Sequence, residues 1–245
     1  MVTSLHKLGM YICIQINNNT LKEMISLKKF TFNPFSENTY IIWDETKEAV
    51  IIDPGMVDGR EEQELVDFID SNGLTPVKLF LTHAHIDHVL GCYFVKKQWE
   101  LTFLAHPLCE TVLQMSERAA EMYGVPYTPS PLPDQAINEG ELLMFGKSEM
   151  ELLFVPGHAP DHLALVDRAG NKTIAGDVLF DGSVGRVDLP GSDAKALSDS
   201  IQQKMYALPD EMVVYSGHGG ETTIGKEKKT NPFVREGWSG FLQGE

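Results

Sequence analysis

The chain has 245 residues, 42% of them hydrophobic, and its 35 acidic and 20 basic residues give a formal charge of −15 at pH 7. This length and composition predict a globular protein that can bury a sizeable core. The acidic balance repels phosphate backbones and argues against a nucleic acid as substrate, and no stretch approaches the roughly 18 apolar residues that a membrane helix needs.

Cysteine usage and the N-terminal region favour a reducing, cytoplasmic location. Cys13, Cys92 and Cys109 form no CxxC pair and no disulfide framework. The apolar run 8–14 is short and lacks the small-residue cleavage site of a signal peptide. We expect a cytoplasmic protein with a small-molecule substrate, no nucleic-acid partner and no membrane association. The sequence indicates no particular oligomeric state.

The first half of the chain predicts strands followed by helices. Residues 1–23 look like an N-terminal extension, with Met24 as a candidate start, and 24–245 like a single domain. The apolar residues Leu65, Phe68 and Ile69 recur at helical spacing before Gly73, which predicts an amphipathic helix over 61–72. Further helices are expected at 89–99 and from Pro107. Strands are expected at 27–32, 39–43, 49–53, 77–82 and 101–105.

The second half begins with a proline-rich stretch, 124–140, which predicts a surface loop or lid. A helix is expected over about 192–208. The expected strands lie around Leu142, Leu152, Leu163 and Ile174 and over 212–216. Runs of strands with interspersed helices predict an α+β fold in which two packed sheets are covered by helices.

A short turn, "THAHIDH" at 82–88, is crowded with groups that bind metals. His83 and His85 can share a side while the chain is extended, and Asp87 and His88 follow at the start of the next helix. Imidazole and carboxylate are ligands that Zn²⁺, Fe²⁺ and Mn²⁺ accept. The turn alone therefore predicts a metal site but does not say how many ions it binds.

Three later stretches repeat one design, because each places a metal-binding side chain in a glycine-marked turn after an apolar strand. These side chains are His158, Asp177 and His218. With the turn at 82–88 they make seven donors, which are too many for one tetrahedral ion and suit two ions that share a bridge. The remaining histidines, His6, His106 and His162, are interpreted as structural.

These residues, in this order, resemble the metallo-β-lactamase superfamily and its glyoxalase II-like branch. The resemblance covers about 27–233 and includes "IIDPG" and "GRVDLPGSD". It implies an αββα sandwich with the metals at one edge between the sheets. The chain departs from the pattern at Asp161, where relatives often have Gly.

The resemblance also implies a role for each donor. His83, His85 and His158 would bind the first metal, Asp87, His88 and His218 the second, and Asp177 would bridge the two. Asp53 would support a metal-bound histidine, with a turn cap before Pro54 as the alternative interpretation.

The expected chemistry is hydrolysis with two divalent ions, most simply zinc, with iron or manganese as alternatives. A water shared by two ions is acidic enough to supply hydroxide at neutral pH for attack on a carbonyl carbon. Asp87 would be the catalytic residue that orients this hydroxide and takes up its proton. The resemblance favours a small acyl thioester as substrate.

Substrate contacts are expected from four residues, Tyr123, Tyr127, Phe180 and Arg186, with Arg186 as an anion clamp. Loop packing is the alternative for the aromatic residues, and an ion pair with Asp188 or Asp193 is the alternative for Arg186. Only 27 residues follow His218. We therefore expect no full C-terminal helical domain of the kind that helps glyoxalase II enzymes grip glutathione.

Two rival functions share these motifs. One is a persulfide dioxygenase-like enzyme that would use a single iron held by His83, His158 and Asp177. The other is a non-catalytic binding protein that keeps the metals for stability. A penicillin-type lactamase is disfavoured, because those members of the superfamily lack a bridging aspartate such as Asp177.

Overall fold

A computed structural model describes residues 25–235 of the chain. The predictions for residues 1–23, Met24, His6 and Cys13 lie outside this range. Within it, no helix is long and apolar enough to cross a membrane.

The first sheet is built from the N-terminal half of the chain. Its strands are β1 (Ser26–Phe32), β2 (Glu37–Trp43), β3 (Glu48–Ile52), β4 (Thr75–Phe80), β5 (Thr102–Ala105) and β6 (Gln135–Ala136), in that spatial order. The pairs β1–β2 and β2–β3 are antiparallel, and β3 to β6 run parallel. The parallel strands therefore all end at the same edge of the sheet.

The second sheet is built from the C-terminal half. Its strands are β7 (Leu142–Phe145), β8 (Ser148–Phe154), β9 (Leu163–Asp167), β10 (Lys172–Gly176), β13 (Val213–Ser216) and β14 (Thr222–Thr223). They lie in the order β14-β13-β10-β9-β8-β7, and β10 and β13 form its one parallel pair. A separate small hairpin joins β11 (Leu179–Phe180) and β12 (Ser183–Val184).

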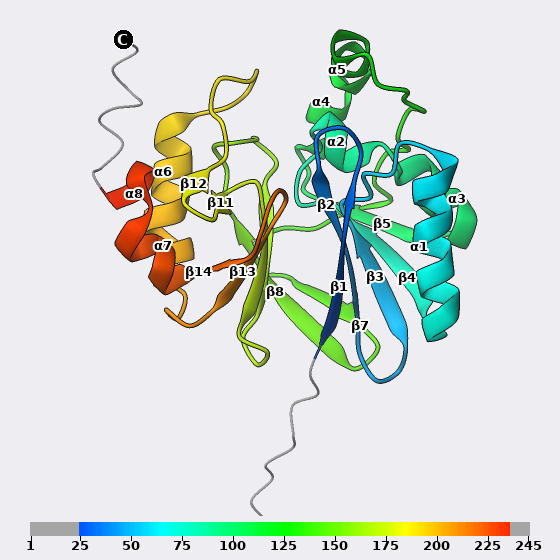
Figure 1. Ribbon diagram of the computed structural model, residues 1–245, viewed down its shortest axis with the longest axis horizontal. Helices are drawn as coiled ribbons and strands as arrows, with labels where there is room; N and C mark the ends of the chain where they lie inside the picture. The colour runs from blue at the N-terminus through cyan, green and yellow to red at the C-terminus, as the bar shows by residue number, and fades with distance from the viewer. Residues whose placement is uncertain (1–24, 236–245) are drawn as a thin grey trace, which may run out of the picture.

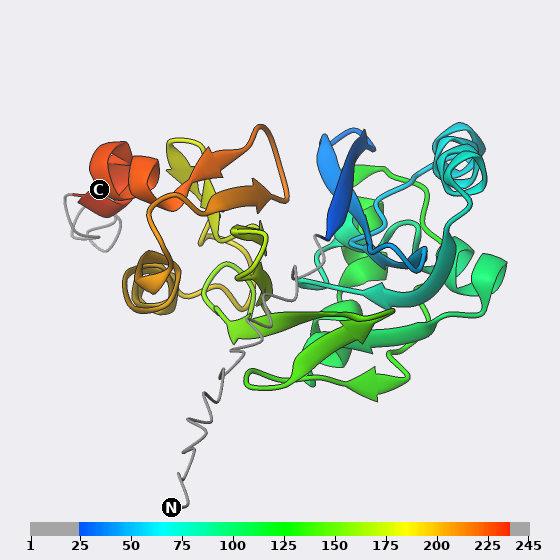
Figure 2. The ribbon, with the colours of Figure 1, turned by 90° about the horizontal axis from the view of Figure 1, so that it is seen from below.

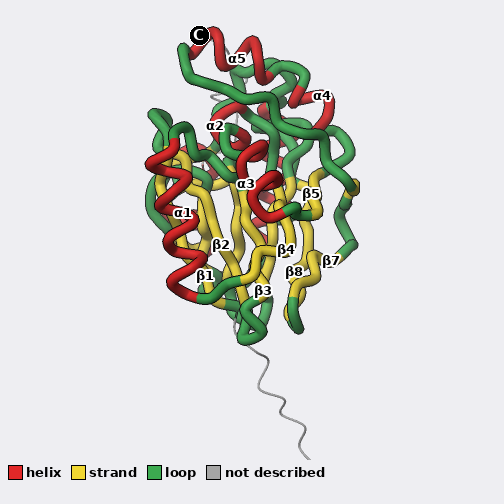
Figure 3. The backbone as a smooth tube through the Cα atoms, turned by 90° about the vertical axis from the view of Figure 1, so that its right-hand side faces the viewer, coloured by secondary structure: helices red, strands yellow, loops and turns green. Residues whose placement is uncertain are grey.

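Helices cover the outer face of each sheet (Figures 1 and 2). Beside the first sheet lie α1 (Gly59–Asn72), α2 (Ile86–Val89), α3 (Cys92–Trp99), α4 (Cys109–Leu113) and α5 (Ser116–Tyr123). Beside the second lie α6 (Ala194–Gln203), α7 (Ile224–Thr230) and α8 (Pro232–Arg235). Figure 3 shows α1 and α3 across the outer face of the first sheet.

Three apolar clusters separate these four layers. Tyr40, Ile52 and Phe80 of the first sheet join Leu165 and Ile174 of the second in a cluster between the sheets. A second cluster packs the first sheet against its helices, and a third packs the second sheet against α6 and α7. The predicted αββα sandwich is therefore confirmed.

Local details differ from the predicted elements. The expected helix over 89–99 is interrupted at Gly91, whose amide donates to the Pro54 carbonyl at 2.7 Å. Asp87 and His88 lie in the short helix α2, which ends before this break. The expected helix from Pro107 is likewise two helices, α4 and α5. The pattern also missed the short elements β6, β11, β12, β14, α7 and α8.

Candidate metal centre

The seven predicted donors come together at the edge of the sandwich where several strands end. The turn at 82–88 follows β4, His158 lies between β8 and β9, Asp177 follows β10, and His218 follows β13. Four segments far apart in the chain thus meet at one place. This edge is at the top of Figure 1, near α2.

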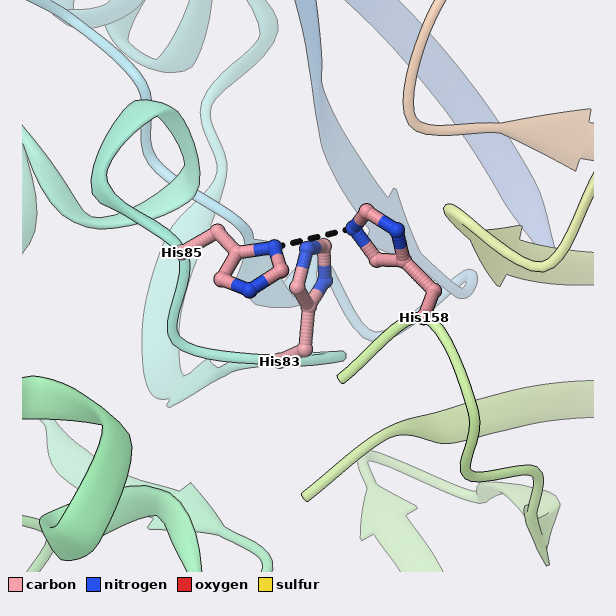
Figure 4. A group of neighbouring side chains, drawn as sticks. All are labelled: His83, His85 and His158. Atoms are coloured by element: carbon pink, nitrogen blue, oxygen red, sulfur yellow. Dashed lines mark hydrogen bonds between the residues drawn. The ribbon is translucent and has the colours of Figure 1, made fainter. Parts of the chain in front are cut away.

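One group of donors consists of His83, His85 and His158. Each offers one ring nitrogen, and these three nitrogens lie within 4.8 Å of one another. The Nδ1 of His85 lies 2.9 Å from the Nε2 of His158. The His83 ring stands edge-on to both, with centroids 4.8 and 5.0 Å away. Figure 4 shows the three rings converging from the turn at 82–88 and the loop at His158.

A second group consists of Asp87, His88 and His218, and a third group of Asp53, His83 and His88 overlaps the first two; in each, the ligand atoms lie within 4.8 Å of one another. Asp87 Oδ2 lies 3.0 Å from His218 Nε2. Asp177 lies between the two groups, because its Oδ2 is 3.4 Å from His158 Nε2 and 3.5 Å from His218 Nε2. Its Oδ1 is 3.5 Å from His88 Nε2. A carboxylate in this position can contact ions in both groups.

The outward nitrogens of four histidines are occupied by oxygen partners. His83 Nδ1 lies 3.0 Å from Thr82 Oγ1 and His88 Nδ1 lies 3.1 Å from Asp53 Oδ2. His158 Nδ1 and His218 Nδ1 lie 2.9 and 3.1 Å from the carbonyls of Arg186 and Phe35. Because each of these Nδ1 atoms can donate its proton outward, the Nε2 lone pairs are left facing the centre.

Three of the inward-facing atoms are buried without hydrogen-bond partners, which leaves them free to bind an ion. They are His83 Nε2, His88 Nε2 and Asp177 Oδ1. Buried polar atoms without partners are costly, so several of them facing one point indicate a site for a bound ion. Imidazole and carboxylate donors suit a divalent transition ion. The residues present therefore fit a pair of divalent metals.

Burial and nearby carboxylates shift the histidine pKa values in opposite directions at different positions of the centre. Burial holds the pKa of His83 well below its usual value and lowers that of His85 to about 3, so both imidazoles are neutral as metal ligands must be. Burial would also lower the pKa of His218, but Asp177 and Asp87 overcome it and raise that pKa to about 10. The two carboxylates thus draw positive charge to the centre.

Asp53 links the first sheet to the metal-binding turn. It accepts hydrogen bonds from the Thr82 amide at 2.7 Å and the Thr82 hydroxyl at 2.6 Å, in addition to its contact with His88. Its backbone is in the left-handed region, with φ 49°, which an aspartate tolerates better than most residues. Asp53 therefore orients His88 directly and His83 through Thr82.

Two residues at the centre were not found from the sequence. His162, which was interpreted as structural, lies beneath the site: its ring stacks on His83 at 4.7 Å and its Nε2 accepts from the Asp177 amide at 3.0 Å. Glu37 is fully buried, with Oε1 3.8 Å from His88 Nδ1. The residues around His162 and Glu37 in the sequence do not indicate a place at the centre, because the partners of both side chains come from distant segments of the chain.

A cavity of about 750 Å³ opens over the centre. Tyr123, Phe180 and Arg186 line it, as the sequence predicted for substrate contacts, together with Phe35. Tyr127 does not line it. That ring packs against the helix-covered core of the first sheet, and its hydroxyl accepts from the Ser130 amide.

The side chains of Arg186 and His106 have partners outside the donor cluster. The Arg186 guanidinium makes two hydrogen bonds of 2.7 Å to Asp188, the ion pair expected as the alternative to an anion clamp. His106 stacks on Phe154 with ring centroids 4.4 Å apart and takes no part in the donor cluster.

Comparison with known proteins identifies the family. The model of the metallo-beta-lactamase superfamily matches residues 32–218, which include all seven donors. The chain belongs to the metallo-β-lactamase superfamily. Members of this superfamily bind divalent metals, and the histidine-rich centre agrees with that property.

Relatives in this superfamily cover most of the chain. The hydroxyacylglutathione hydrolase GloC of Haemophilus influenzae is 36% identical over 202 residues, which are 82% of this chain and 93% of the relative. The solved structure of TTHA1623 in a di-iron-bound form has a TM-score of 0.76 at 39% identity and covers 84% of this chain and 100% of that one. The BLEG-1 B3 metallo-beta-lactamase has a TM-score of 0.79 at 32% identity, with coverages of 85% and 99%.

Gly217 is expected to be essential to the centre, because no side chain fits there. A Cβ at this position would lie 2.1 Å from Asp177 Oδ1 and 2.8 Å from His88 Cε1. We expect Gly217→Ala to displace Asp177 and lower metal affinity by at least about tenfold, measured by metal content after dialysis against a weak chelator. Gly220→Ala is the matched control, because a Cβ there meets nothing within 4 Å. Equal metal content in the two variants would contradict this account.

Proposed function

We propose that this protein is a binuclear metal-dependent hydrolase that acts on small acyl thioesters. The observation that carries the proposal is the division of the donors into two groups with the Asp177 carboxylate between them. One group offers three imidazoles and the other offers two imidazoles and a carboxylate. Such a set matches two adjacent divalent ions better than one.

Two bound divalent ions would lower the pKa of a shared water to about 7 and polarise the oxygen of a substrate carbonyl. The chain's own part is to hold the ligands and handle the proton. His83, His85 and His158 would hold one ion, and Asp87, His88 and His218 the other. Burial keeps the pKa of His158 lowered as well, so the first three imidazoles are neutral before any ion binds.

Asp87 is the residue we assign to proton transfer. It lines the cavity, and its side chain is 15% exposed, which leaves it reachable from the substrate side. Its Oδ2 lies 3.0 Å from His218 Nε2, so the carboxylate is held in a fixed orientation. In the net reaction water adds to the acyl carbon, the carbon–sulfur bond breaks, and the thiol leaves with a proton that Asp87 can pass on.

The choice of a thioester is supported by similarity to a protein named a hydroxyacylglutathione hydrolase. The cavity over the centre is large enough for an extended acyl or thiol group beyond the reacting carbonyl.

The experiment that tests this proposal combines metal analysis with a substrate panel. We expect close to two equivalents of divalent metal per chain, zinc or a zinc–iron mixture, in protein purified without chelators or a histidine tag. The panel contains acyl thioesters, oxygen esters with the same acyl groups and a β-lactam, and we expect the thioesters to be hydrolysed fastest. Faster turnover of the lactam would overturn the substrate assignment.

Other outcomes would favour the rival functions. One equivalent of iron per chain, together with oxygen consumption when a persulfide is added, would support a persulfide dioxygenase-like enzyme and contradict the hydrolase. Two bound metals without turnover of any panel member would favour the metal-stabilised binding protein.

A further inference from the structure

One wall of the cavity over the metal centre is formed by one face of a helix that carries both apolar side chains and an arginine. Met115, Arg118, Ala119 and Met122 line the cavity and follow the spacing i, i+3, i+4, i+7 along α5 and the residue before it. Figure 1 shows α5 standing above α2, close to the edge where the donors meet. The wall therefore lies against α2, the short helix that carries Asp87 and His88.

The apolar part of this wall is unusually open to solvent. Met115, Met122 and Tyr123 are 39%, 70% and 42% exposed, and all three belong to the exposed large hydrophobic residues of the range 25–235. Tyr123 is braced by an edge-on contact with Phe35, with ring centroids 5.3 Å apart. Apolar surface gathered beside a cavity is typical of a ligand-binding wall.

The charged part of the wall is Arg118. Two arginines line the cavity, and they differ in their partners. Arg186 is neutralised by two 2.7 Å hydrogen bonds to Asp188. Arg118 makes no side-chain hydrogen bond or ion pair to any residue of the described part of the chain. In a protein with a formal charge of −15, this is an unpaired cation at the rim of a cavity that leads to the reacting carbonyl.

We propose that Arg118 binds an oxyanion of the substrate, a carboxylate or a phosphate, that is separated from the thioester by an apolar segment lying along Met115 and Met122. This inference rests on the proposed thioesterase function and names the substrate class of the same cavity. A guanidinium pairs with such oxyanions through two parallel hydrogen bonds, which give direction as well as affinity. The methionines are flexible and polarisable and adapt to an alkyl segment.

The test uses acetyl thioesters that differ only at the far end of the thiol. One series carries a carboxylate on alkyl chains of increasing length, made from mercaptopropionate, mercaptohexanoate and mercaptoundecanoate. The methyl ester of each removes the charge, and mercaptohexyl phosphate replaces carboxylate by phosphate. We expect at least one anionic thioester to exceed its neutral counterpart in kcat/KM by about 10- to 100-fold, mainly through a lower KM. The better of the two anions identifies the group.

Variants of Arg118 assign this preference to one residue. Arg118→Met keeps an apolar stem and removes the charge, so the ratio of anionic to neutral kcat/KM should fall to near one. Arg118→Lys should restore part of the ratio, because it keeps the charge but not the two-pronged geometry. Arg60→Met is the matched control: this arginine is 78% exposed on α1 and lines no part of the cavity. An unchanged ratio in Arg118→Met, or the same fall in Arg60→Met, would overturn the proposal.

Binding of an inert analogue separates this inference from the proposed function. Ethylthiohexanoate replaces the thioester by a thioether and cannot be hydrolysed, and its affinity can be measured by calorimetry on the metal-loaded protein. If no thioester is turned over but this carboxylate binds about 10-fold or more tighter to the wild type than to Arg118→Met, the thioesterase function fails and the anion site stands. If thioesters are hydrolysed without any preference for the anion, the function stands and the anion site fails.

Discussion

Asp87→Ala is expected to lower kcat for a thioester by at least about a thousandfold, within the range that a positioned proton acceptor supplies. Asp87 has two roles in the proposed site, as a metal ligand beside His218 and as the proton acceptor facing the cavity. The variant removes both without touching the apolar cores, so the protein should stay folded. Turnover at saturating substrate measures the loss of kcat, and circular dichroism shows whether the variant stays folded.

Metal content distinguishes the two roles of Asp87. A variant that keeps two equivalents of metal but loses turnover would assign the loss to proton transfer, whereas a variant with one equivalent would assign it to the metal site. Asp70→Ala is the matched control, because Asp70 is an exposed carboxylate near the end of α1. Turnover by Asp87→Ala within tenfold of the wild type would rule out the catalytic role of this residue.

The edge that carries the centre could be predicted because its signals are local. His83 and His85 alternate after an apolar strand, and the other donors follow strands at glycine-marked turns. Strand ends and tight turns are encoded within a few residues, so the sequence shows both the donor and the element that positions it. The resemblance to a known family then implied how the donors divide between two groups.

What the sequence did not show depends on contacts between distant segments. The break at Gly91 accompanies the hydrogen bond of its amide to the Pro54 carbonyl, and the position needs glycine because a Cβ there would lie 2.7 Å from the Met56 methyl group. The stacking of His162 on His83 and the exposure of Arg118 beside the cavity likewise follow from packing. Arg186 and Asp188 are close in sequence, so their ion pair could be foreseen as an alternative, whereas the unpaired state of Arg118 could not.

Asp161 is expected to destabilise the folded protein at neutral and alkaline pH. Its side chain is buried, and neither carboxylate oxygen has a hydrogen-bond partner. Burial raises its pKa from 3.8 to about 7. The folded state therefore binds a proton that the unfolded state releases, so this residue costs stability as the pH rises from 3.8 to 7. Above pH 7 the ionised carboxylate lowers the free energy of unfolding by at most roughly 4 kcal/mol.

Asp161→Asn removes the buried charge while keeping the size of the side chain. We expect its free energy of unfolding to exceed that of the wild type by a few kcal/mol at pH 8, and by progressively less toward pH 4, where Asp161 is protonated. Urea unfolding at several pH values measures this difference. Divalent ions at the centre would favour the charged form, so the difference should be larger with a chelator than with metal. Asp70→Asn changes an exposed carboxylate and should give no such pH-dependent difference. If the difference in unfolding free energy between Asp161→Asn and the wild type stayed constant from pH 5 to 8, the loss of stability would not come from this carboxylate.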